Sequence, residues 1–148
     1  MTRQDIHHGV FWGLLGEVTK SLTKLESRSD VVSDVVSDVV SDVVNQEHFV
    51  CSSLNGANEV IEKRVVTVGL LNANQVHPRE VFSDAFAERA ASIILVHNHP
   101  SGTTAPSHED IAVTKRLVEA GEILGIKIHD HIIVSKNEHT SMKERGLI

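Results

Sequence analysis

The chain has 148 residues, enough for one domain with a short extension, and carries a formal net charge of −6 with a single cysteine, Cys51. The acidic balance argues against nucleic acid as the main partner, and one cysteine excludes an intrachain disulfide and a cysteine-based zinc cluster. No apolar run approaches the length of about 18 residues that a membrane span needs, so we expect a cytoplasmic protein.

Residues 1–44 are expected to form an N-terminal extension. Val18 to Leu25 could make a short helix, and residues 31–44 repeat Val-Val-Ser-Asp three times before two final valines. A four-residue period nearly matches one helical turn, so the repeat favours a helix with a drifting valine stripe over a strand. The simplest interpretation is a tolerated, solvent-facing helix. Packing against a second copy, which would give a homodimer, is the alternative.

The second part of the chain, residues 45–148, carries clearer signals. His48 to Leu54 predicts a strand, Asn55-Gly56 a tight turn, and Glu59 to Gly69 a returning strand rich in β-branched residues. A helix is expected from about Arg79 to Ala91, because a proline precedes it and an acidic residue lies in its first turn. Its apolar face would hold Val81, Phe82, Ala85 and Phe86.

Ser92 to Val96 is a continuous apolar run, typical of a strand covered on both faces. A loop from 97 to 106 leads to an amphipathic helix that Gly125 should end. Strands are expected at 126–134 and 138–142. The predicted buried side of the helix holds Ile111, Thr114, Leu117, Val118, Gly121 and Leu124. This order of elements predicts an α/β fold, an α+β sandwich around a mixed sheet.

Two histidines stand at the end of the apolar strand. In an extended chain, residues i and i+2 point to the same side, so the side chains of His97 and His99 should converge. Alone, this pair is also compatible with ordinary hydrogen-bonded histidines. Ser107 and Asp110, which open the next helix, have by themselves a structural explanation as a capping box. Together, two imidazoles and one carboxylate could close on a single ion and leave a fourth tetrahedral position for water.

These residues also carry a family resemblance. The string from His97 to Gly102, followed by Pro106-Ser107 and Asp110, resembles the JAMM (MPN-plus) metalloprotease motif. It is most similar to the RadC-like branch of bacterial JAMM-domain proteins, as are the segments 76–82 and 130–134. The resemblance covers about residues 45–148.

The resemblance implies a JAMM/MPN-like mixed β-sheet flanked by helices, with cytidine-deaminase-like layering. It implies one Zn²⁺ per chain, held by His97, His99 and Asp110. It also implies that Ser107 hydrogen-bonds the oxyanion of the tetrahedral intermediate, while a glutamate acts as general base on a zinc-activated water. Glu47 matches that position, and Glu80 is the rival for it.

The function so implied is that of a zinc-dependent metallo-hydrolase that cleaves a peptide or isopeptide bond in a peptide or protein substrate. Two alternatives stay open: a catalytically inactive JAMM-fold binding module, and a protein associated with DNA repair. The cluster from His129 to His131 is interpreted as ordinary strand residues and not as a second metal site. Cys51 is interpreted as a small strand residue and not as a nucleophile.

Overall fold

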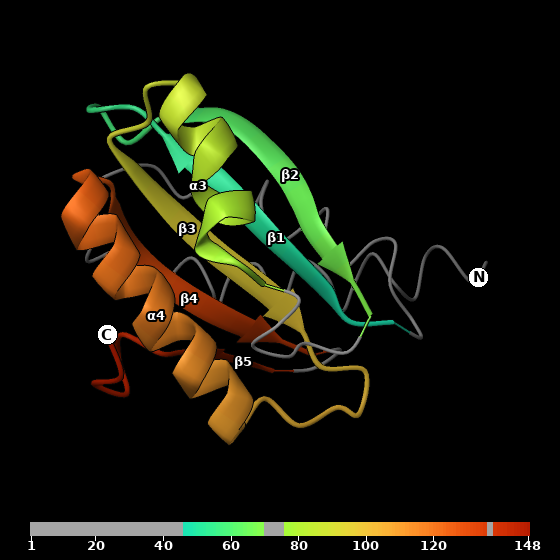
Figure 1. Ribbon diagram of the computed structural model, residues 1–148. Helices are drawn as coiled ribbons and strands as arrows, with labels where there is room; N and C mark the ends of the chain where they lie inside the picture. Colours follow the sequence, from blue (N-terminus) through green and yellow to red (C-terminus); the bar gives the residue numbers. More distant parts are fainter. Residues whose placement is uncertain (1–45, 70–75, 136–137) are drawn as a thin grey trace.

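The computed structural model describes residues 46–69, 76–135 and 138–148 (Figure 1). The helices expected at 18–25 and 31–44, and with them the expected extension of residues 1–44, lie outside the described residues. Within the described part of the chain, no helix has both the length and the apolar character that crossing a membrane would require.

Five strands form one mixed sheet in the order β2-β1-β3-β4-β5. β3 and β4 run parallel, and every other neighbouring pair is antiparallel. The strands are β1 (His48–Leu54), β2 (Val60–Val68), β3 (Ser92–Asn98), β4 (Lys127–Val134) and β5 (His139–Ser141). The helices are α3 (Pro78–Ala87), between β2 and β3, and α4 (His108–Leu124), which makes the crossover from β3 to β4. This is the mixed, helix-flanked α+β architecture that the sequence predicts.

Both helices lie on the same face of the sheet, as Figure 1 shows. The hydrophobic core fills the space between them and the sheet, with Phe49 and Leu95 from the strands meeting Phe82 of α3 and Leu117 of α4. Every residue of β3 is buried, as its continuous apolar run predicts for a strand in the middle of a sheet. The C-terminal end of this buried strand carries the histidine pair.

The turn predicted at Asn55-Gly56 opens a longer loop, residues 55–59, which joins β1 to β2. The Asn55 carboxamide oxygen accepts hydrogen bonds from the backbone amides of Ala57 and Glu59, both at 2.9 Å. Asn58 adopts a left-handed conformation with φ of 59°, which asparagine tolerates better than most residues. The turn therefore sets the antiparallel pairing of the first two strands.

The helix predicted to reach Ala91 ends earlier, at Ala87. Arg89 takes a left-handed conformation with φ of 55°, and the amides of Arg89 and Ala90 bond back to the carbonyls of Phe86 and Ala85. This is a Schellman ending, which usually contains glycine, so the sequence gives no signal for it. The expectation that Phe86 lies on the buried face is also wrong, because 61% of this residue is exposed.

The next elements differ from expectation at their edges. β3 continues through Asn98, two residues beyond the apolar run, and β4 begins at Lys127. Ser107 and Gly125 cap α4 as predicted. Leu124 does not belong to the buried side of α4, because this last residue of the helix is 42% exposed. Asp110 and Val113, which the prediction leaves out, are buried.

Candidate metal centre

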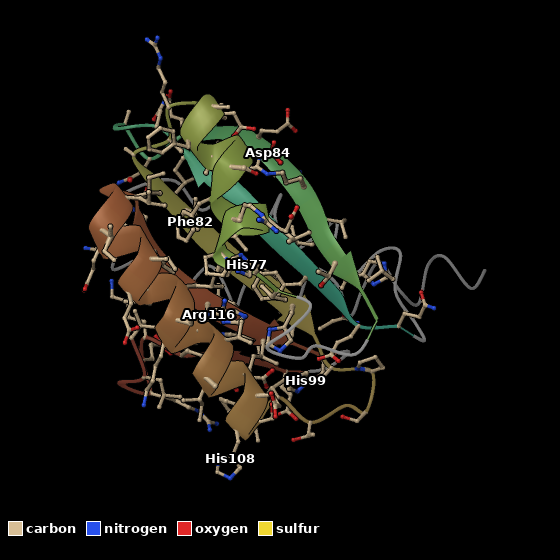
Figure 2. The ribbon with its side chains drawn as sticks, in the orientation of Figure 1. His77, Phe82, Asp84, His99, His108 and Arg116 are labelled. Atoms are coloured by element: carbon tan, nitrogen blue, oxygen red, sulfur yellow. The ribbon has the colours of Figure 1, made fainter. Side chains whose placement is uncertain are left out.

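Four polar side chains from three places in the chain meet at one end of the sheet. His97 lies near the end of β3 and His99 just beyond it, Asp110 lies in the first turn of α4, and Glu47 directly precedes β1. One potential ligand atom from each falls within 4.8 Å of the others. Figure 2 shows His99 at the end of β3 beside the start of α4. The residues proposed from the sequence as metal ligands are thus brought together.

Within this group, His97, His99 and Asp110 lie closest to one another. The Nε2 atoms of His97 and His99 lie 2.9 Å apart, and each lies 3.2 Å from an oxygen of Asp110. Ligands held ~2.0–2.1 Å from a tetrahedral zinc ion lie about 3.3 Å from one another. The spacing and the chemistry of this donor set therefore fit a tetrahedral divalent cation such as zinc.

Glu47 lies at the rim of this group. Its Oε1 atom is 3.6 Å from His99 Nε2 and 4.0 Å from His97 Nε2, farther than Asp110 from either ring. The side chains of Glu47 and His99 are 13% and 12% exposed, while those of His97 and Asp110 are buried. The group consequently opens toward solvent on the side of Glu47 and His99.

The hydrogen bond of His99 orients its ring. Its Nδ1 atom lies 2.9 Å from the carbonyl oxygen of Thr103, which can only accept. In the neutral ring the single hydrogen therefore sits on Nδ1, and the lone pair of Nε2 points into the group. Imidazoles that bind metals are commonly fixed in this way by an acceptor on the opposite nitrogen.

Asp110 has two functions in the local structure. Its Oδ2 atom accepts from the Ser107 amide at 2.7 Å, and its own amide donates to Ser107 Oγ at 3.0 Å. The capping box expected from the sequence is therefore present. Both carboxylate oxygens also face a histidine, so the capping interaction holds the carboxylate in the direction that a metal ligand needs.

The electrostatics of the group match this geometry. Burial acts to raise the pKa of the Asp110 carboxyl, but the His97 and His99 imidazoles and the Ser107 amide outweigh it and hold that pKa well below its ordinary value. The Asp110 carboxylate in turn raises the pKa of His99, against the effect of burial. An ionised carboxylate beside two converging imidazole nitrogens is an environment that favours a cation.

Asn98 holds the segment that contains Glu47. Its Oδ1 atom accepts from the His48 amide at 2.7 Å, and its Nδ2 donates to the carbonyl of Gln46 at 2.9 Å. The carbonyl of Glu47 accepts from the Gly69 amide at 2.8 Å. The backbone around Glu47 is thus tied both to β3 and to the end of β2.

The remaining candidates lie elsewhere or do other work. Glu80, the rival for the general base, is in the first turn of α3, 3.7 Å from the Arg79 guanidinium, and is outside the four-residue group. Ser107 is exposed and borders the group through its contacts with Asp110. Cys51 is buried in β1, and burial raises the pKa of its thiol to about 12, which leaves it a poor nucleophile.

His131 is the residue that sequence reasoning missed. The sequence predicts an ordinary strand residue at this position, whereas the structure places a fully buried ring there, with Nε2 only 2.6 Å from His97 Nδ1. Asp130 does not join it in a second metal site. The Asp130 carboxylate accepts from the Ser141 hydroxyl and the Lys143 amide, and within the described residues only one group of potential metal ligands occurs.

Comparisons with known proteins agree with these observations. The sequence model of the RadC-like JAB domain matches residues 25–147. A UPF0758 protein of Bacillus cereus strain B4264 is 58% identical over 103 residues, which make up 70% of this chain and 46% of that relative. UPF0758 proteins of Bacillus anthracis strain A0248 and Bacillus thuringiensis subsp. konkukian strain 97-27 match to the same extent. The chain therefore spans about half the length of these curated relatives.

Proposed function

The chain belongs to the RadC-like JAB domain family, and on this basis we propose that it is a zinc-dependent hydrolase that cleaves a peptide or isopeptide bond. The observation that supports the proposal is the convergence of His97, His99 and Asp110, with Glu47 at the open side of the group. His97, His99 and Asp110 would hold one Zn²⁺. Bound there, the ion would supply Lewis acidity, which makes a water molecule more acidic and polarises a carbonyl.

In this proposal Glu47 acts as the general base. The partly exposed carboxylate lies within 4.0 Å of both ring nitrogens, so it can reach a water that enters from solvent. It takes one proton from that water as the water oxygen attacks the carbonyl carbon. It then delivers the proton to the amine nitrogen as the carbon–nitrogen bond breaks, which returns Glu47 to its ionised form.

Ser107 would stabilise the negative charge on the carbonyl oxygen. Its Oγ atom accepts from the Asp110 amide, and that interaction leaves the hydroxyl hydrogen to donate elsewhere. Because Ser107 is exposed and its neighbour Asp110 faces both histidines, a substrate oxygen at the site would lie near this hydroxyl. A donor placed where charge develops contributes more to the transition state than to the ground state.

The open side of the group favours a hydrolase over a structural zinc site. Structural zinc sites are closed by four protein ligands, whereas catalytic sites keep three and leave one position for water. Here the Nε2 atoms of His97 and His99 lie 2.9 Å apart, each lies 3.2 Å from a different oxygen of Asp110, and Glu47 stands back at 3.6–4.0 Å from the two rings. This spacing suits a base beside the open position.

The test begins with metal content. We expect the full chain to bind about one zinc per molecule, and zinc at 100 times its dissociation constant to raise the free energy of unfolding by about 2.7 kcal/mol. His97→Ala and Asp110→Asn should lose both effects. His108→Ala is the matched control, because this exposed histidine lies two residues before Asp110 and points away from the sheet (Figure 2).

Activity is then measured on the zinc-loaded chain with peptide and isopeptide libraries analysed by mass spectrometry. Cleavage that is lost in His97→Ala and kept in His108→Ala would support the hydrolase. Zinc binding without any cleavage would favour a binding module of the same fold. Failure of the native chain to retain zinc would overturn the proposal.

A further inference from the structure

A buried chain of hydrogen bonds runs from the backbone of α4 to His97. The Thr114 hydroxyl lies 2.7 Å from the carbonyl oxygen of Asp110 and 2.6 Å from His131 Nδ1. On the other side of the same ring, His131 Nε2 lies 2.6 Å from His97 Nδ1. Thr114, His131 and His97 are all fully buried, so these groups have one another as partners in place of water.

The chemistry of the partners fixes the direction of this chain. The Asp110 carbonyl can only accept, and the other neighbour of the hydroxyl, the Met142 sulfur at 3.4 Å, is also only an acceptor. The single hydrogen of the Thr114 hydroxyl is therefore not available to His131. It follows that His131 Nδ1 carries a hydrogen and donates it to Thr114 Oγ1.

The hydrogen on His131 Nδ1 also determines which nitrogen donates between His131 and His97. A neutral imidazole has one N–H, so a hydrogen on Nδ1 of His131 leaves its Nε2 as an acceptor. The nitrogen that faces it, His97 Nδ1, must then be the donor. In the neutral ring of His97 the remaining nitrogen, Nε2, then keeps its lone pair, and this nitrogen faces His99 and Asp110.

We propose that Thr114 and His131 are positioning residues that lock His97 in the Nδ1–H tautomer, so that its Nε2 lone pair is presented to the metal before any metal arrives. The assignment of Nε2 as a zinc ligand rests on the proposed function, whereas the tautomer itself does not. The lock matters because His97 has an alternative. A hydrogen on Nε2 could be donated to Asp110 Oδ1, 3.2 Å away, and would block the metal site.

The packing around the two rings supports this role. Phe49 of β1 stacks on His97 at a centroid distance of 6.1 Å and meets His131 edge-on at 5.4 Å. The planes of both imidazoles are therefore held by an apolar neighbour while their nitrogens are paired. Because the Thr114 hydroxyl also bonds the backbone of Asp110, this series of hydrogen bonds connects two of the three candidate ligands, Asp110 and His97.

The direct test is the tautomer of His97 in the full, metal-free chain. Histidine ¹⁵N shifts and long-range ¹H–¹⁵N couplings distinguish a protonated from an unprotonated ring nitrogen. We expect Nδ1–H with unprotonated Nε2 for both His97 and His131. A neutral His97 ring with its single hydrogen on Nε2 in the native chain would overturn the proposal, whether or not zinc binds.

Variants of Thr114 supply the second test. Thr114→Val keeps the shape but removes the hydroxyl, and we expect a shift of His97 toward Nε2–H and a loss of roughly 10- to 100-fold in zinc affinity. Thr114→Ser keeps the hydroxyl and should restore both readouts. Equal unfolding midpoints for these variants would show that the change is local. If Thr114→Val does not fold, the tautomer of the native chain still decides.

The outcomes separate this proposal from the proposed function. A native chain with the expected tautomer that retains no zinc would contradict the hydrolase and leave the lock in place. A native chain that binds zinc but holds His97 as Nε2–H when metal-free would contradict the lock alone. A Thr114→Val variant with unchanged tautomer and unchanged zinc affinity would also contradict it.

Discussion

The Asn98 side chain is hydrogen-bonded to the backbone on both sides of Glu47. The carboxamide accepts from His48 and donates to Gln46, at 2.7 and 2.9 Å, so the one residue that separates His97 from His99 also fixes the candidate base. The antiparallel register pairs Phe49 with His97, and this register brings the end of β3 beside the segment before β1. A single side chain therefore couples the metal ligands to Glu47.

Replacing Asn98 should affect the base more than the metal. In Asn98→Ala we expect zinc affinity close to that of the native chain, because the carboxamide bonds neither histidine ring. Turnover of any cleaved substrate should fall by up to about 100-fold, since small misplacement of a catalytic group has effects of this order. Hydrogen exchange at the His48 amide should become faster, because this amide loses its acceptor, Asn98 Oδ1. This measurement needs no substrate.

The matched control is Asn55→Ala. Asn55 also makes two hydrogen bonds to the backbone through its side chain, but it accepts both from amides in the turn between β1 and β2. Asn55→Ala should lose about 0.5–1.5 kcal/mol of stability for each hydrogen bond removed and keep normal turnover per folded molecule. Equal losses of turnover in both variants would mean that Asn98 acts only through stability.

Glu47 and Glu80 can be separated by the same conservative change. Glu47→Gln should still bind zinc and should lose about 100-fold to 10,000-fold in turnover, because the amide cannot accept a proton from water. Glu80→Gln should retain full turnover, since its carboxylate pairs with Arg79 on an exposed face of α3. The reverse pattern in steady-state rates would show that the base has been assigned to the wrong residue.

The sequence predicts those parts of the site that depend on local geometry. His97 and His99 converge because alternate residues of a strand share a side, and Ser107 and Asp110 form their capping box within one helical turn. Neither relationship needs knowledge of another segment. The position of Glu47 depends on the β1–β3 register, and only the family resemblance indicated it.

The role of His131 could not be predicted because it depends on an irregular pairing. The register between β3 and β4 shifts between Ile93 and Ile94, so that Leu95 pairs with His131. Without the shift, Leu95 would pair with Asp130, and the carboxylate would face the helices in place of the imidazole. Such a bulge leaves no local signal in the sequence, and neither does the left-handed Arg89 that ends α3.

The Cys51 thiol should be unreactive in the folded chain. Burial raises its pKa from 9.0 to about 12, so at pH 8 the thiol stays protonated and out of reach of reagents. Labelling with a chromogenic disulfide should be slow in buffer and rapid in denaturant. Between pH 9 and 12 the unfolded thiol loses its proton before the folded one, so the free energy of unfolding should fall with rising pH, relative to Cys51→Ala. Rapid labelling of the native chain at pH 8 would contradict the buried position.

Variants of Ser107 test its proposed role at the oxyanion, provided that they separate this role from the capping of α4. Ser107→Ala loses both the hydroxyl and the cap, and should lower stability by about 0.5–2 kcal/mol, whereas Ser107→Gly loses the hydroxyl at a cost of only a few tenths. Both variants should lose turnover to a similar extent, about 100- to 1,000-fold, the range for removal of one oxyanion donor. Zinc affinity should persist, because Asp110 Oδ2 bonds the backbone amide of residue 107, which neither substitution removes.

Ser107→Thr provides the rescue, since it keeps both a hydroxyl and a helix cap. Its turnover should lie close to that of the native chain if the hydroxyl donates to the substrate. If turnover instead follows stability across the three variants, with Ser107→Gly nearly as active as the native chain, then Ser107 serves only as the cap of α4. In that case another group would have to stabilise the charge on the substrate oxygen. The match between Ser107 and the serine of the family motif would then be explained by the capping box alone.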